Sequence, residues 1–104
     1  MQTTKPFISI VCTCYNEEDV INHFLKSITE ILKTSQKTYE TIFIDDGSTD
    51  KTLDVLIESK KSYEHIKILK LSRNFGKEIA LTAGIDATVG ETVVPIDVDF
   101  IFNL

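Results

Sequence analysis

The spacing of apolar residues changes along this chain, and the changes predict alternating strands and helices. Short apolar, β-branched runs predict strands over 7–14, 39–44, 66–71 and 92–96. Between them apolar residues recur at every third or fourth position, which predicts helices over about 17–32, 50–62 and 77–87. The connections are long enough for crossovers. We therefore expect an α/β fold, a Rossmann-like parallel sheet of about four strands with three helices.

Polar residues before the first two helices predict where those helices begin. Asn16 has the side chain of an N-cap, and the acids Glu17 and Glu18 suit the positive end of a helix dipole. Ser48 or Asp50 is predicted to start the second helix. Capping is thus the structural interpretation of these residues, beside any functional one.

Polar clusters follow all four predicted strands. They are Tyr15 to Glu18, the pair Asp45 and Asp46, the basic stretch 72–77 with Arg73 and Lys77, and the pair Asp97 and Asp99. Because parallel strands end at one edge of a sheet, where α/β proteins bind ligands, we expect these clusters to form one site. A turn explains the presence of one of the two acids Asp45 and Asp46, and folding gives no reason for the other.

The pair Asp97 and Asp99 predicts a metal site. Residues two apart on an extended chain face the same way, so the two carboxylates lie side by side and repel without a cation. A hard ion, Mg²⁺ or Mn²⁺, held with substrate phosphates fits them. Arg73, the only arginine, or Lys77 is then placed to assist at a diphosphate.

Composition narrows the function classes. The 104 residues are 42% hydrophobic and 26% charged, ordinary values for one globular domain, and the net charge of −5 argues against nucleic acid as a partner. No window approaches the ~18 apolar residues of a membrane span, so we expect a soluble, cytoplasmic fragment. Cys12 and Cys14 are predicted to be buried reduced thiols, because no further cysteine or nearby histidine completes a metal site.

Other phosphate-binding folds do not match. The glycines lie at 47, 76, 84 and 90, which excludes the G-x-G-x-x-G of a dinucleotide-binding fold. Gly76-Lys77 is followed by Glu78 and has no glycine five residues before it, which excludes a P-loop. Phosphatases of the haloacid dehalogenase type carry an N-terminal D-x-D-x-[TV], whereas this pair is C-terminal and Ile101 takes the Thr/Val place.

Four segments together resemble glycosyltransferase family 2. They are SIVCTCYNEED (9–19), FIDDGSTDKT (43–52), LSRNFGKEIALTAGIDATVGE (71–91) and IDVD (96–99). The third is most similar to the polyprenyl-phosphate branch, typified by dolichol-phosphate mannose synthase and bacterial undecaprenyl-phosphate sugar transferases. The match runs from about Pro6 to Asp99.

The resemblance implies the N-terminal, nucleotide-binding half of a GT-A fold and an inverting, metal-assisted sugar transfer. The donor would be a UDP- or GDP-sugar and the acceptor a lipid phosphate. By the resemblance, Tyr15 and Glu17 line the nucleoside and Asp46 accepts a hydrogen bond from the base. Arg73 and Lys77 lie near the nucleotide, Asp97 contacts sugar or ribose, and Asp99 ligates the metal. Asp45 is left to stabilise the turn.

The chain departs from the family pattern after Asp99. Members of this branch continue with Leu-Gln-Asp-Pro-Pro, whereas this chain reads FIFNL over 100–104. We expect a truncated donor half that lacks the acceptor half and the catalytic base and is inactive alone; full-length relatives associate with the membrane at its cytoplasmic face. We also expect the chain to form a homo-oligomer through the exposed strand 92–96 or through residues 100–104. The alternative function is a non-catalytic remnant that acts as a binding or self-association module.

Overall fold

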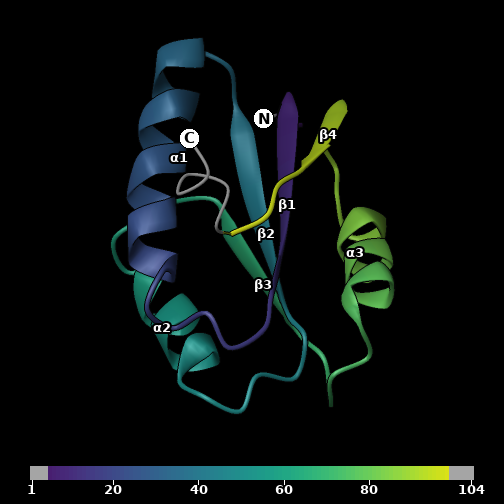
Figure 1. Cartoon of the computed structure of the whole chain (residues 1–104). Coiled ribbons are helices and arrows are strands. Elements are labelled where there is room, and N and C mark those ends of the chain that lie inside the picture. The colour runs from purple at the N-terminus through teal and green to yellow at the C-terminus, as the bar shows by residue number, and fades with distance from the viewer. Residues whose placement is uncertain (1–4, 99–104) are drawn as a thin grey trace.

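The structure, a computed structural model, describes residues 5–98 and confirms the predicted order of strands and helices (Figure 1). The elements are β1 (Ile8–Cys14), α1 (Ile21–Ser35), β2 (Tyr39–Asp45), α2 (Thr52–Ser59), β3 (Ile66–Lys70), α3 (Lys77–Asp86) and β4 (Thr92–Pro95). Most bounds lie within a few residues of those predicted. Asp99, the expected metal ligand, lies outside the described residues.

The four strands form one parallel sheet in the order β3-β2-β1-β4. β1 is central: it pairs with β2 from Ile8 to Cys14 and with β4 from Ile8 to Val11. Because all strands run the same way, the predicted polar clusters follow their carboxyl ends at one edge, the lower edge in Figure 1. The predicted Rossmann-like parallel sheet is therefore confirmed.

Helices α1 and α2 cover one face of the sheet, and α3 covers the other (Figure 1). On the first face Phe24 of α1 meets Phe43 of β2 edge to face, with ring centroids 6.0 Å apart. Cys12 and Cys14 are buried on this face as free thiols, which confirms the prediction. The neighbouring Cys14 thiol and burial raise the pKa of Cys12 well above its usual range, so this thiol stays protonated.

On the other face α3 packs closely against the sheet through small residues. A methyl group at Gly84 would lie 2.4 Å from Cδ1 of Ile44 and 2.6 Å from Cγ1 of Val11. Ala80, one turn earlier, is buried in the same cluster. The helix backbone therefore approaches two central strands at a distance that a larger side chain would prevent.

The predicted N-cap of the first helix is wrong. Helix α1 begins at Ile21, and Val20 precedes it without a side-chain cap. Asn16 has a left-handed backbone (φ 54°), and its side-chain oxygen accepts the N–H of Thr49 at 2.8 Å and of Asp50 at 3.3 Å. Asparagine tolerates this conformation, and the bonds to a distant turn replace capping.

The second helix begins at Thr52, close to the predicted place, but its N-cap residue is Lys51 and not Ser48 or Asp50. Asp50 accepts the N–H of Thr52, the first residue of α2, at 2.9 Å, and also accepts the hydroxyl of that residue. The first turn of α1, by contrast, holds no acid, because 17–20 forms a turn ahead of the helix. Asp50 therefore has a structural role at the start of α2.

A buried polar network ties the amino ends of the strands together, and the sequence pattern does not reveal it. Glu40 on β2 accepts hydrogen bonds from the Ser9 hydroxyl of β1 and, at 2.9 Å, from the N–H of Val89. Lys67 of β3 forms an ion pair with the same carboxylate at 2.7 Å, and Gly90 donates its N–H to Ser9 at 2.8 Å. The network joins three strands to the segment that leads into β4.

We expect this network to make the free energy of unfolding depend on pH. Burial opposes the charge on Glu40, but hydrogen bonds from Lys67, Ser9 and Val89 outweigh it and lower the pKa of Glu40 below the ordinary 4.5. Its contribution is therefore present above that value and is lost as the pH falls through the lower, folded-state pKa. Urea unfolding should show Glu40→Gln about 1–2 kcal/mol less stable at pH 7, with a smaller difference from wild type at pH 3.

The matched control for this prediction is Glu64→Gln, which changes an exposed acid that forms an ion pair with the exposed His65. Its curves should follow wild type at both pH values, since exposed ion pairs contribute little. A constant difference between Glu40→Gln and wild type from pH 7 to pH 3 would contradict a role for the charge.

Strand β4 lies at the edge of the described sheet, with β1 on one side. Its two middle residues are partly buried, and Thr92 and Pro95 are exposed. The exposed edge agrees with the sequence, whereas self-association through it stays a prediction. Among residues 5–98, the helices are too short and too polar to cross a bilayer.

Candidate functional site

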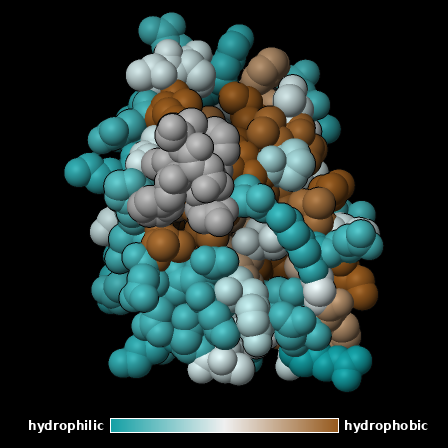
Figure 2. Space-filling model, viewed as in Figure 1, coloured by the Kyte–Doolittle hydropathy of each residue, from teal (hydrophilic) through white to brown (hydrophobic). Residues whose placement is uncertain are grey.

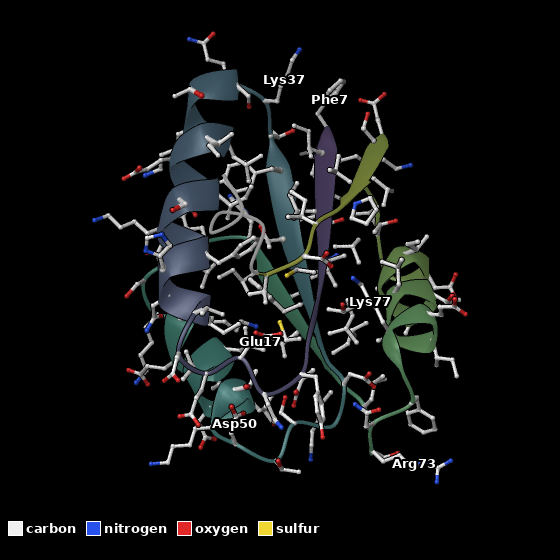
Figure 3. All side chains as sticks on the ribbon, viewed as in Figure 1. Phe7, Glu17, Lys37, Asp50, Arg73 and Lys77 are labelled. Atoms are coloured by element: carbon white, nitrogen blue, oxygen red, sulfur yellow. The ribbon has the colours of Figure 1, made fainter. Side chains whose placement is uncertain are left out.

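A pocket of about 370 Å³ lies at the carboxyl edge of the sheet and gathers five predicted site residues. These are Tyr15, Glu17, Asp46, Lys77 and Asp97. Thr13, Cys14, Asn74, Gly76 and Val98 complete its lining. Figure 3 shows Glu17 and Lys77 on opposite sides of this region. Segments that follow four different strands thus contribute to one hollow, as expected at this edge.

Asp46 holds two parts of the pocket together. Its side chain is buried (the residue is 4% exposed), and its two oxygens accept the N–H of Phe75 at 2.8 Å and of Gly76 at 3.1 Å. The carboxylate that is surplus to its own turn therefore fixes the loop before α3. Recognition of a base by Asp46, implied by the family resemblance, stays a prediction.

The turn after β2 packs directly against that loop. Asp45 accepts the N–H of Ser48 at 3.2 Å, which confirms its predicted role in the turn. Gly47 has a φ of +72°, and a methyl group there would lie 2.3 Å from the backbone carbonyl carbon of Arg73 and from the amide nitrogen of Asn74. Only glycine allows the two backbones to approach this closely.

The turn after β1 is braced by the turn after β2. The N–H of Asn16 donates to the Ser48 hydroxyl at 2.9 Å, and the N–H of Glu17 donates to the Thr52 hydroxyl at 2.8 Å. Tyr15, next to these contacts, keeps its ring partly exposed at the pocket. The rim thus consists of short, cross-linked turns.

An ion pair spans the pocket between α3 and the residues after β4. Lys77, the first residue of α3, contacts a carboxylate oxygen of Asp97, and both side chains remain more than half exposed. Within the part of the pocket that residues 5–98 form, three carboxylates (Glu17, Asp46, Asp97) face one ammonium group. This excess of negative charge disfavours a phosphate unless a cation accompanies it.

The described residues fit a metal held jointly with a ligand. No group of three or more His, Cys, Asp or Glu side chains between residues 5 and 98 is arranged to hold an ion by itself. Mg²⁺ in proteins is often bound by one or two carboxylates plus substrate phosphates, which needs fewer protein ligands. Asp97 offers such a carboxylate at the pocket; its predicted partner Asp99 lies outside the described residues.

Arg73 is the one described candidate that does not line the pocket. Its guanidinium lies over the Phe75 ring, 4.8 Å from the centroid, and Figure 3 shows the side chain pointing outward. Asn74 and Gly76 line the pocket in its place, and sequence reasoning missed both. Side chains that alternate along an extended loop fall into two sets, here Asn74 with Gly76 and Arg73 with Phe75. The sequence does not show which of the two sets faces the pocket.

A larger hollow of about 660 Å³ lies at the opposite, amino edge of the sheet. Tyr39, His65 and Lys67 are among its lining residues, and none of the predicted site residues contributes to it. The smaller pocket is the better candidate site, because it holds the predicted residues at the carboxyl ends of the strands.

Known proteins that are similar to this chain in sequence include glycosyltransferases. The chain is 53% identical over 92 residues to an uncharacterized glycosyltransferase of Synechocystis sp. and 42% identical over 92 residues to the bactoprenol glucosyl transferase of Shigella phage SfX. Each match covers 88% of this chain. The chain spans only 29% and 30% of the length of these relatives.

The fold has a solved counterpart. The mannosyltransferase PcManGT from Pyrobaculum calidifontis, determined in complex with GDP-Man and Mn²⁺, matches with a TM-score of 0.79 at 25% identity. The match covers 93% of this chain and 28% of that one. The described sheet and helices therefore correspond to part of a GT-A glycosyltransferase. The model of the family Glycosyl transferase family 2 matches residues 9–103, and the chain belongs to that family.

Proposed function

We propose that this chain is the donor-binding part of an inverting, metal-dependent glycosyltransferase. Its donor is a UDP- or GDP-sugar, and the complete protein transfers a hexose to a polyprenyl phosphate at the cytoplasmic face of the membrane. The observation that carries the proposal is the pocket that gathers Tyr15, Glu17, Asp46, Lys77 and Asp97 at the carboxyl edge. The bactoprenol glucosyl transferase and the GDP-Man complex among the similar proteins support it.

In this proposal each described residue has a defined task. Tyr15 and Glu17 border the nucleoside, and the turn cross-links keep them in place. Lys77 is positioned for the diphosphate, and Asp97 for the sugar or ribose. Asp46 orders the loop that contributes Asn74 and Gly76 and faces the base. The acceptor and the catalytic base would be handled by segments beyond this chain.

Asp97 and Asp99 would hold Mg²⁺ or Mn²⁺ together with the phosphates of the donor. When bound, such an ion neutralises the charge that develops on the departing nucleoside diphosphate. The chain's own contribution is the surplus of carboxylates, which favours the complex of donor and cation over the donor alone. Lys77 supplies the positive charge at the opposite side of the pocket.

Calorimetric titration with UDP-glucose and GDP-mannose tests this proposal. We expect one of the two to bind in the presence of Mn²⁺ and to bind at least about tenfold more weakly without it, because the uncompensated carboxylates repel the diphosphate. Asp97→Asn and Asp99→Asn should each remove most of the Mn²⁺ dependence.

The control variant is Asp86→Asn, an exposed acid at the end of α3 that does not line the pocket. It should bind the donor as wild type does. Donor binding that is equally tight with and without Mn²⁺ would contradict the metal-dependent part of the proposal.

A non-catalytic binding or self-association module is the second candidate. The observation that favours it is the unpaired outer side of β4 within the described sheet. Light scattering separates the two. A mass that rises with concentration, together with no nucleotide binding at millimolar levels, favours this second function; a monomer that binds donor argues against it.

A further inference from the structure

An ammonium group is paired with the pocket carboxylate that is expected to meet a metal ion. Lys77 contacts a carboxylate oxygen of Asp97, and both residues line the pocket at the carboxyl edge. The two side chains are 63% and 57% exposed, so the pair lies open to water. Figure 2 shows mainly hydrophilic residues toward the lower end of the molecule, where this edge lies. A ligand that enters the pocket therefore meets Asp97 with a cation already beside it.

The backbone is fixed on both sides of this pair, whereas the side chains are not enclosed. The residue before Lys77 donates its N–H to Asp46 at 3.1 Å. The residue before Asp97 donates its N–H to the carbonyl of Val11 at 2.9 Å. Figure 3 shows the Lys77 side chain between α3 and the strands. Lys77 can therefore change its partner by rotation about side-chain bonds, without movement of the sheet or of α3.

Helix formation gives no reason for a lysine at this position. Lys77 is the first residue of α3, where the helix dipole is positive and disfavours a cation. Glu78, the next residue, has the charge that suits this end of a helix. An interaction outside the helix must offset the cost of the cation, and Asp97 supplies one. The position of Lys77 thus points to a role in the pocket.

The described carboxylates do not form a complete metal site. Within residues 5–98, no three His, Cys, Asp or Glu side chains are arranged around a common ion. An ion that arrives alone has to share Asp97 with the ammonium group, which repels it. An ion that arrives with a nucleoside diphosphate brings phosphate oxygens, and these offer Lys77 a second anionic partner. The exchange of partners then leaves no charge unpaired.

We propose that Lys77 pairs with Asp97 in the free protein and moves to the diphosphate of the donor when the donor and a divalent ion bind; this inference rests on the proposed function. Lys77 thereby disfavours binding of the ion alone and makes the ion and the donor bind cooperatively. Because such coupling is reciprocal, the ion strengthens donor binding by the same factor as the donor strengthens ion binding. The free protein is therefore selective for the ion that accompanies a donor.

Titration of the whole 104-residue chain with Mn²⁺ alone, followed by the EPR signal of the free ion, tests the first step. We expect Lys77→Gln to bind Mn²⁺ about fivefold more tightly than wild type, because a positive charge beside the carboxylate is removed. Lys77→Arg keeps the charge and should stay within about twofold of wild type. Unchanged or weaker Mn²⁺ binding by Lys77→Gln would overturn the inference.

Two controls separate the effect of the pair from that of overall charge. Lys70→Gln removes an exposed lysine at the end of β3, at the same edge of the sheet but outside the pocket lining. Its Mn²⁺ affinity should stay within about twofold of that of wild type, because salt screens exposed charges away from the pocket. In an Asp97→Asn background, Lys77→Gln should no longer tighten Mn²⁺ binding, since the pair is already broken. An effect as large in either control would overturn the assignment to the pair.

Donor titration tests the second step, and the expected change has the opposite sign. With Mn²⁺ saturating, Lys77→Gln should bind the donor, UDP-glucose or GDP-mannose, about fivefold more weakly, because the diphosphate loses a cation. A purely structural role of Lys77 would change both affinities in the same direction, and unchanged donor affinity would overturn the move to the diphosphate.

The two titrations also separate this inference from the proposed function. Mn²⁺-dependent donor binding by wild type, without tighter Mn²⁺ binding by Lys77→Gln, overturns only this inference. Tighter Mn²⁺ binding by Lys77→Gln, without any donor binding by wild type, overturns the proposed function and with it the move of Lys77 to the diphosphate.

Discussion

Replacing Gly47 with alanine is expected to destabilise the chain by about 3 kcal/mol, the sum of a left-handed backbone cost and overpacking. The added methyl group would lie 2.3 Å from two backbone atoms of the loop at Arg73 and Asn74, neither of which is the end of a flexible side chain. The loop must move away, and the pocket it lines must change with it. Urea unfolding measures the first effect and donor titration the second.

Gly76→Ala is the matched control for this prediction. Gly76 also has a positive φ, +103°, but nothing lies within 4 Å of a methyl group placed there. Its backbone (φ 103°, ψ 155°) lies in a region that only glycine adopts readily, so its substitution adds strain of about 1–3 kcal/mol but no clash with the loop at Arg73 and Asn74. The amide chemical shifts of Arg73 and Asn74 should therefore change in Gly47→Ala, and unchanged shifts there would contradict the close approach of the two backbones.

Asp46→Ala is expected to have an effect of similar size, about 3 kcal/mol, because two partly buried amides lose a charged acceptor. The amides are those of Phe75 and Gly76, which define the start of α3. Hydrogen exchange of these two amide protons should become much faster, and donor binding should be lost with the ordered loop. Exchange measured residue by residue separates this local effect from global unfolding.

Asp46→Asn provides a graded comparison. Its side chain keeps one acceptor oxygen, so one of the two amides retains a partner and the loss should be intermediate. Asp54→Ala, an exposed acid on α2, should change exchange at Phe75 and Gly76 little. Wild-type protection of both amides in Asp46→Ala would contradict the structural role of this carboxylate.

The architecture could be predicted from the sequence because the buried residues of each strand and helix recur at regular spacings. Four apolar runs and three helical repeats are enough to give the strand and helix order, and parallel strands then place Asp46 and Asp97 at one edge without further information. Five of the six described candidates meet in one pocket for this reason. Edge placement follows from chain direction and does not need the side-chain contacts.

Contacts between polar residues that are far apart in the sequence produce no such regular spacing. Asn16 suits a helix cap by local rules, yet its partners lie in the turn after the next strand. Glu40 and Ser9 are buried polar residues inside apolar runs, and only strand register brings them together. Arg73 faces outward because Asp46 fixes the direction of the loop, which residue spacing does not specify.

The central position of β1 has a consequence for synthesis of the protein. β1 is the first strand to leave the ribosome, but its neighbour β4 is the last of the described strands, so one edge of β1 waits while three helices and two strands are made. During that interval the apolar core residues of β1 border an open edge, which is prone to pair with other nascent chains. The risk of aggregation is therefore greatest before β4 emerges, when chaperone protection of the nascent chain has most effect.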